Sequence, residues 1–316
     1  MKFLSKIAIF ALTVVFFSCG RSGSQHDSYD DTPTSGEILI LADESYQPLV
    51  QVQIDTFMEI YKYAKINVRY LPESELFNQL MTNDTVRLAI TGRALTADEK
   101  SYFESHKIIP RPLKIAEDAI ALIVNPENPD TNLTMEQVES IISGTISTWN
   151  SLGKSSLKDS IRIVYDRSGS ANARYLKERF LGQKSLPPNS YATNSNAEVV
   201  EYVSKTKGAI GVIGMNWISD RDDPTARTFL SKIKVIGVSQ TDSLGNRGDY
   251  YQPFQAYIAL HNYPFTREVM IINREGRNGL GTGFASFVAG DKGQRMIRMM
   301  GLLPATMPVR LIQVNQ

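Results

Sequence analysis

The feature that most constrains the fold is an alternation of short apolar strands with amphipathic helices in the first third of the chain. In the first helix, apolar residues recur at helical spacing, at positions 50, 54, 57, 58 and 61. The pattern predicts strands at 37–41, 66–71 and 87–90, and helices at about 48–63, at about 73–83 and from 96 onward. Strands and helices that alternate in this way predict a parallel sheet with helices on its faces.

A hydroxyl residue follows each of these three strands, namely Ser45, Ser74 and Thr91. The carboxyl ends of parallel strands lie on one edge of a sheet, which is where open α/β folds bind their ligands. A single hydroxyl in such a turn is more often a helix cap than a ligand contact. Three of them in successive turns favour a shared binding edge.

A fourth strand-to-helix turn contains the residues most typical of an anion site. A β-branched run at 161–165 leads into Asp166-Arg167-Ser168-Gly169-Ser170, and an amphipathic helix follows. Such a turn gathers backbone N–H groups, hydroxyls and the positive end of a helix dipole, and these groups attract anions. Arg167 and Arg174 add cationic donors. The alternative interpretation is an ordinary helix N-cap formed by Ser168 or Ser170.

The remainder of the chain continues the mixed pattern. Strands are expected at 119–124, 208–214, 234–238, 255–260 and 268–272, and helices at about 134–143, 196–206, 279–289 and 291–301, with a loop at 241–251. The glycines of 208–214 match no phosphate-binding loop. We expect them to permit close packing of the backbone.

Composition excludes several classes of function. The 316 residues carry a net charge of +1 without a basic tract, so nucleic acid is not an expected partner. Cys19 is the only cysteine, and the three histidines show no metal-binding spacing. We therefore expect no zinc site, no Cys/His dyad and no disulfide within the chain. Neither a metal nor another cofactor is expected.

The N-terminus has the pattern of an export signal. A basic start precedes an apolar run at 7–17, which is too short to span a membrane, and Ser18-Cys19-Gly20 follows. The segment 16–19 resembles the lipobox of bacterial lipoproteins, so Cys19 is the expected lipidation site at the end of a signal peptide over 1–19. The alternative is a plain signal peptide with a chance cysteine. Residues 20–35 are polar and predict a flexible tether.

The motifs, taken in order, resemble those of the phosphate-binding solute receptors of ABC importers over nearly all of the mature length. No single motif is decisive, and the resemblance depends on their number and order. The matching pieces are 45–49, 70–76 with Ser74, 89–95 with Glu99, 165–170, 208–214, 263–267, 293–294 and 301–304.

The resemblance implies an α/β fold of the type II periplasmic-binding-protein kind, with two lobes that each contain a mixed sheet flanked by helices. Lobe 1 would comprise 36–121 and 257–316, and lobe 2 would comprise 122–256. The hinge would lie near Ala121 and Tyr257. The ligand would be buried between the lobes, in contact with Ser45, Tyr46, Ser74, Thr91, Arg93, Arg167, Ser168, Gly169 and Ser170.

The implied function is that of a solute-binding protein rather than an enzyme. It would be a monomer that captures inorganic phosphate and passes it to an ABC permease. The expected location is the bacterial cell envelope, facing the periplasm or on the cell surface, where the lipid on Cys19 would anchor the chain. On the motif alone, Arg167→Ala should weaken anion binding more than tenfold.

Three departures from the family pattern leave the ligand open. Arg167 replaces a glycine of the motif, Val164 stands where an arginine is common, and Arg93 lies where some members have an acidic residue. Asp43, Glu44 and Asp166 remain as candidate acceptors for a proton of hydrogen phosphate. Sulfate or molybdate is the alternative ligand, and a sensor is the alternative role on the same fold.

A more distant alternative is a secreted hydrolase that uses Ser168 or Ser170 as its nucleophile. No Gly-x-Ser-x-Gly elbow surrounds these serines, and the three histidines lie in unrelated contexts.

Overall fold

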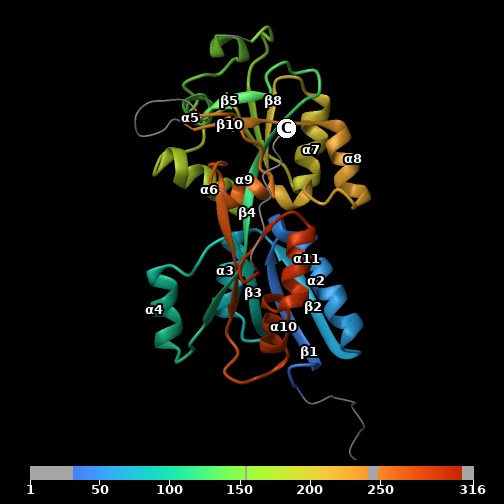
Figure 1. The fold of residues 1–316 in the computed structure, drawn as a ribbon. Coiled ribbons are helices and arrows are strands. Elements are labelled where there is room, and N and C mark those ends of the chain that lie inside the picture. Colours follow the sequence, from blue (N-terminus) through green and yellow to red (C-terminus); the bar gives the residue numbers. More distant parts are fainter. Residues whose placement is uncertain (1–30, 154, 241–247, 308–316) are drawn as a thin grey trace, which may run out of the picture.

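The computed structural model describes residues 31–153, 155–240 and 248–307, and within them the chain forms two α/β lobes stacked end to end (Figure 1). In lobe 1, the sheet order is β2-β1-β3-β11-β4, with β1 parallel to β2 and β3, and β11 antiparallel to β3. The parallel arrangement predicted for the first three strands is therefore confirmed. These strands are β1 (Ser35–Asp43), β2 (Tyr63–Leu71), β3 (Val86–Thr91) and β11 (Thr266–Asn273).

Helices cover this sheet as the alternating pattern predicts. The main ones are α2 (Gln47–Ile60), α3 (Glu73–Thr82), α4 (Ala97–Ser105), α10 (Leu280–Ala289) and α11 (Asp291–Met299). A short 3₁₀ turn, η1 (Glu44–Tyr46), lies between β1 and α2. The start of α4 is a capping box, in which Thr96 and Glu99 bond each other's backbone N–H.

The strand β4 (Arg111–Val124) runs through both lobes. Its first part pairs with β11 over 111–119, and its second part pairs with β8 over 120–124. Ala121 lies just after this change of partner. The position of the hinge and the lobe boundaries stay predictions, but β4 is one of the segments that connect the lobes.

Lobe 2 continues the same sheet in the order β4-β8-β6-β7 and adds a two-stranded sheet of β5 and β10. The strands of lobe 2 are β5 (Asn132–Thr134), β6 (Arg162–Tyr165), β7 (Ser190–Ala192), β8 (Ala209–Gly214), β9 (Lys234–Val235) and β10 (Gly237–Ser239). The short strand β12 (Leu303–Pro304) pairs with residues 116–117 of β4, in the part of β4 that also pairs with β11. The helical segments are α5 (Met135–Ile142), η2 (Trp149–Leu152), α6 (Ala171–Leu176), the π-helix η3 (Lys177–Leu181), α7 (Asn196–Lys205), η4 (Met215–Trp217), α8 (Pro224–Lys232) and α9 (Gln255–Ala259).

The glycine-rich strand β8 packs as its sequence predicts. A Cβ atom on Gly211 would lie 2.7 Å from Val203, 2.8 Å from Ile123 and 2.9 Å from Val199. These distances are shorter than normal contacts, so only glycine lets β8 approach α7 and β4 this closely.

Three predicted strands differ in the structure. The strand expected at 234–238 is divided into β9, which pairs with β4, and β10, which pairs with β5, and the strand expected at 119–124 is part of the longer β4. Residues 255–260 form the helix α9 and its C-cap instead of a strand, and backbone bonds join Ile258 N to Phe254 O at 3.0 Å and Leu260 N to Ala256 O at 3.0 Å. The few apolar residues of this segment fit the two-residue repeat of a strand as well as the 3.6-residue repeat of a helix. In the helix that forms, Ile258 is buried. Tyr257, a predicted hinge position, therefore lies in a helix.

The N-terminal signal, Cys19 and most of the predicted tether lie outside the described residues, as does 241–247 of the predicted loop. Among the residues that are described, no helix has the length and apolar character that crossing a membrane requires.

Candidate functional site

The strand-end turns of the two lobes meet at the lobe boundary. Ser74 N donates to Gly169 O at 3.1 Å, and Ser45 Oγ donates to Asp166 Oδ2 at 3.4 Å. The Thr91 turn lies beside them, because a Cβ atom on Gly92 would lie 3.5 Å from the side chain of Ala171. The structure thus brings the three hydroxyl turns of lobe 1 onto the 166–170 turn of lobe 2 and the first residue of α6, Ala171.

Asp166 is the most heavily bonded carboxylate at this boundary. It accepts hydrogen bonds from Ser170 Oγ at 2.5 Å, Asn172 Nδ2 at 3.0 Å and Asn196 Nδ2 at 3.1 Å, besides the one from Ser45. Burial raises the pKa of Asp166 to about 7, although the Ser170 hydroxyl lowers it. Near neutral pH this side chain can therefore either carry a proton or accept one.

Ser170 serves as a helix cap as well as a partner of Asp166. Its Oγ accepts a hydrogen bond from Ala173 N at 3.1 Å and donates one to Asp166 Oδ1. The N-cap interpretation of this serine is therefore confirmed, and its contact with an anion stays a prediction. The helix α6 that it caps has only 6 residues, so the dipole argument has less force than the sequence suggested.

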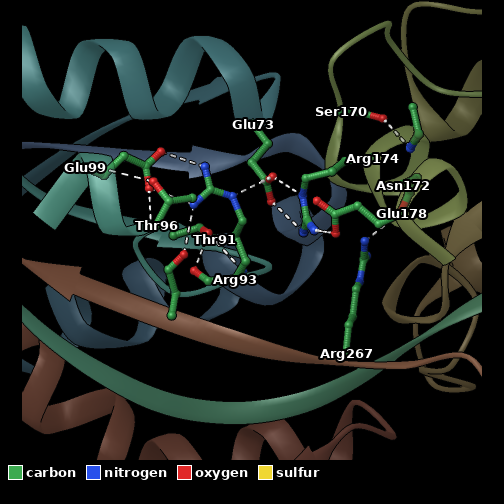
Figure 2. Close-up of polar contacts among 12 residues, drawn as sticks. Glu73, Thr91, Arg93, Thr96, Glu99, Ser170, Asn172, Arg174, Glu178 and Arg267 are labelled. Atoms are coloured by element: carbon green, nitrogen blue, oxygen red, sulfur yellow. Dashed lines mark hydrogen bonds and ion pairs between the residues drawn. The ribbon is translucent and has the colours of Figure 1, made fainter. Parts of the chain in front are cut away.

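A buried arginine that the sequence analysis did not select lies at the centre of the boundary. The Arg267 side chain is 3% exposed, and its Nε and Nη2 donate to Asp118 Oδ2 at 3.1 and 2.9 Å. Its Nη1 donates to Asn172 Oδ1 at 2.8 Å, and its guanidinium lies 4.8 Å from the ring centre of Tyr46. Arg267 on β11 thus binds Asp118 of β4 and Asn172 of lobe 2, and Figure 2 shows Arg267 and Asn172.

Several polar atoms around Arg267 are buried and have no hydrogen-bond partner. In the described ranges they include Asp43 Oδ2, Tyr46 OH, Asp118 Oδ1 and Asn216 Oδ1. Burial, together with the charge of Glu73, raises the pKa of Asp43 to about 6. Because buried polar atoms are rarely left unpaired, this cluster is suited to a polar ligand or to ordered water.

We call Asp43, Asp118, Asp166 and Arg267 the buried centre. We call Glu44, Ser74, Arg167 and Gly169 the rim. The side chains of the buried centre are almost inaccessible to solvent. Of the rim residues, Arg167, Ser74 and Gly169 are exposed.

The two arginines predicted to contact the ligand already have carboxylate partners. Arg93 pairs with Glu99 at 2.7 Å and with Glu73 at 3.3 Å, and its guanidinium lies 3.6 Å from the ring centre of Phe77. Arg167 pairs with Glu44 at 3.3 Å and donates to Asn194 O at 2.7 Å.

The remaining predicted contacts are divided between the buried centre and the surface. Ser45, Tyr46 and Thr91 are buried, whereas Ser168 is exposed on the turn. The hydroxyl of Thr91 donates to Arg93 O at 3.0 Å and accepts from Arg93 N at 3.1 Å. That these residues contact a ligand stays a prediction.

The sequence carried only a weak signal for Arg267. It belongs to the stretch 263–267, which resembles a C-terminal piece of the family. Asp118 and Asn172 were equally hard to select, because each lies beside an apolar run or inside a helix. In the described residues, no group of three or more His, Cys, Asp or Glu side chains could bind a metal ion.

Comparison with known proteins places the chain in a family. Residues 27–292 match the model of the PBP superfamily domain, and the chain belongs to this superfamily. The phosphate-binding protein PstS of Bacillus subtilis is 23% identical over 311 residues, which cover 96% of this chain and 94% of that protein. The PstS of Staphylococcus epidermidis strain RP62A is 23% identical over 290 residues, which cover 90% of this chain and 84% of the relative.

Solved structures show the same fold. An ABC-type phosphate transport receptor from Vibrio cholerae aligns with a TM-score of 0.63 at 22% identity, over 85% of this chain and 100% of the other. A phosphate-binding protein from Stenotrophomonas maltophilia aligns with a TM-score of 0.62 at 13% identity, over 85% and 91%. The two-lobed α/β architecture expected from the sequence is therefore confirmed.

Proposed function

We propose that the protein is a solute receptor that binds inorganic phosphate between its lobes and delivers it to an ABC permease. The observation that carries the proposal is the meeting of the strand-end turns of both lobes around a buried arginine. The names of the similar PstS proteins and phosphate receptors support the choice of ligand. The protein would act as a monomer and without a cofactor.

The proposed ligand contacts come from both lobes, so that closure around the anion completes the site. They are Ser45, Tyr46, Ser74, Thr91 and Arg93 from lobe 1 and Arg167, Ser168, Gly169 and Ser170 from lobe 2, to which we add Arg267. A micromolar receptor needs about 8 kcal/mol of binding free energy. Four to six hydrogen bonds to a charged group, each contributing roughly 1.5–3 kcal/mol, reach that value after the cost of association.

The carboxylates of the buried centre favour an anion that carries a proton. Asp43 Oδ2 and Asp118 Oδ1 are acceptors without donors, and Asp166 also accepts. Hydrogen phosphate can donate its proton to such an acceptor. Sulfate has no proton to donate at neutral pH, so it would leave the acceptor unpaired and repelled.

We further propose that the receptor is exported and anchored to the membrane through a lipid on Cys19. The basic start, the apolar run at 7–17 and the lipobox-like segment 16–19 support this part of the proposal. Mass spectrometry of the exported protein tests it. A diacylglyceryl group on an N-terminal Cys19 is the expected result. An exported chain without this lipid would instead support the alternative, a plain signal peptide with a chance cysteine.

Calorimetric titration tests the ligand. The chain from residue 20 should release or absorb heat with phosphate and arsenate, and much less with sulfate or molybdate. If sulfate or molybdate binds more tightly than phosphate, the protein is still an oxyanion receptor, but its ligand is not phosphate. Binding of none of the four would exclude an oxyanion receptor.

The hydrolase alternative gains no support from the described histidines. His106 caps α4 and contacts Tyr102 O at 2.8 Å, while His261 follows α9. In the described residues, the Ser170 hydroxyl donates to Asp166 Oδ1 and accepts from Ala173 N, and neither partner is a histidine.

A further inference from the structure

Five side chains of alternating charge cross the lobe boundary beside the proposed site. In order they are Glu99, Arg93, Glu73, Arg174 and Glu178, and Figure 2 shows them as one connected series. Glu73 is the first residue of α3 in lobe 1, and Arg174 belongs to α6 in lobe 2. We propose that Glu73 and Arg174, here called the closure pair, stabilise the closed arrangement of the lobes. The proposal makes Glu73 a positioning residue of the proposed phosphate site, and it rests on that function.

The geometry of the closure pair is that of a strong ion pair. Arg174 Nε donates to Glu73 Oε1, and Arg174 Nη2 donates to Glu73 Oε2 at 3.2 Å. Two parallel bonds of this kind bind a carboxylate firmly and fix its orientation. The Glu73 side chain is 3% exposed, so solvent screens the pair little.

The same contacts explain how the pair can separate. Each partner has a second partner in its own lobe: Arg93 lies 3.3 Å from Glu73, and Glu178 pairs with Arg174. Breaking a buried pair is costly mainly when it leaves one charge without compensation. Here opening leaves Glu73 with Arg93 and Arg174 with Glu178. The pair therefore favours closure without making opening prohibitive, as a receptor that must release its ligand requires.

The closure pair is linked to the proposed ligand contacts through the backbone. Ser74 directly follows Glu73, and its N–H donates to Gly169 O across the boundary. Another contact between the lobes joins Asn216 Nδ2 to Ser45 O at 2.7 Å, and like the Ser74 contact it is formed by uncharged groups. When Arg174 binds Glu73, it also brings the Ser74 turn onto the 166–170 turn. Loss of the pair should therefore loosen the site without removing a ligand contact.

The experiment measures closure directly. The described fold begins at residue 31, so the chain from residue 20 keeps both lobes and contains no cysteine. Spin labels are placed on exposed positions of lobe 1 and lobe 2 through Lys100→Cys and Lys184→Cys. Their distance distribution is recorded with and without phosphate, and the phosphate dissociation rate is measured by stopped flow.

Glu73→Gln should lengthen the distance between the labels at saturating phosphate and speed dissociation by about tenfold. Arg174→Gln should do the same, and the double variant should add little, because both changes remove one interaction. Glu178→Gln is the matched control: it removes the other carboxylate of Arg174 but leaves the closure pair intact, so it should not lengthen the distance. Circular dichroism checks that each variant is folded.

The possible failures are distinguishable. If the wild-type chain binds no phosphate, the proposed function is wrong, and the distances of the ligand-free variants still test the closure pair. If the wild type binds phosphate but folded Glu73→Gln shows unchanged distances and dissociation, the closure pair is overturned. Lengthening in Glu178→Gln equal to that in Glu73→Gln would overturn it as well. Should Glu73→Gln not fold, Arg174→Lys takes its place, since it keeps the charge but loses the paired bonds.

Discussion

The buried centre and the rim each contain an arginine paired with a carboxylate, but the pair is buried in the centre and partly exposed to solvent at the rim. In the centre, Arg267 is 3% exposed and shares its bonds between Asp118 and Asn172. At the rim, Arg167 is 45% exposed and pairs with Glu44 across the boundary. A charge in the centre is costly to leave unpaired, whereas a charge at the rim returns to water. We therefore expect ligand discrimination to depend more on the buried centre than on the rim, and the predictions below test this expectation.

The largest expected effect is that of removing the central cation. Arg267→Gln would leave Asp118 buried without its partner, and loss of one member of a buried pair typically destabilises a protein by about 3–5 kcal/mol. Urea unfolding should show this loss, and phosphate binding should fall with it. The double variant Arg267→Gln with Asp118→Asn should recover much of the stability, because it removes both charges. A loss of stability below about 1 kcal/mol in Arg267→Gln would show that the buried pair contributes no more than an exposed pair at the rim.

The pH dependence of stability tests the carboxylates of the centre. Burial raises the pKa of Asp43 to about 6 and that of Asp166 to about 7, from the 3.8 of an unperturbed aspartate. Between these values and 3.8 the folded state binds more protons than the unfolded state. The stability that each protonated carboxyl contributes is therefore fully present below about pH 4. It is lost as the pH rises to about 6 for Asp43 and to about 7 for Asp166, at up to about 1.4 kcal/mol per pH unit for each group.

Urea unfolding between pH 4 and pH 8 measures this contribution. The variant Asp166→Asn should flatten the curve between about pH 4 and pH 7. The matched control lies outside the site: Asp98→Asn changes an exposed carboxylate at the start of α4 and should leave the slope unchanged. An equal slope in Asp166→Asn and the parent chain would mean that Asp166 titrates normally.

The outline of the fold could be predicted from local pattern, because strand and helix periods in the first third of the chain agree with its buried positions. The glycines of β8 were also interpreted correctly, since only close packing explains their spacing. Residues 255–260 could not be assigned from pattern, because a short apolar run fits a strand or a helix until its tertiary contacts are known.

The site could be predicted only in part for a similar reason. Turns carry local signals, and thus Ser45, Ser74 and the 166–170 turn were selected. Arg267 contacts Asp118 and Asn172, which lie 149 and 95 residues away in sequence. Such partners carry no local pattern. The sequence also could not show that Arg93 is taken up by Glu99 and Glu73.

A smaller effect concerns selectivity between oxyanions. Asp166→Asn replaces an acceptor in the centre by a side chain that can also donate, so the penalty against sulfate should fall. We expect the ratio of phosphate to sulfate affinity to drop by about tenfold, which corresponds to one hydrogen bond of about 1.4 kcal/mol. Parallel calorimetric titrations measure the ratio. If the ratio stays constant, Asp166 does not accept the proton of hydrogen phosphate, and Asp43 becomes the proposed acceptor.

The smallest effect is expected at Arg167, and it distinguishes the motif from the geometry. The motif alone predicts that Arg167→Ala weakens binding more than tenfold. In the structure, Arg167 is half exposed and engaged with Glu44 and Asn194 O. An exposed pair contributes about 0–1 kcal/mol, so the geometry predicts a change in phosphate affinity of less than about fivefold, and less still at high salt. Calorimetry at low and high ionic strength decides between them: a loss above tenfold that persists at high salt would place Arg167 on the ligand and bring the rim into the binding site.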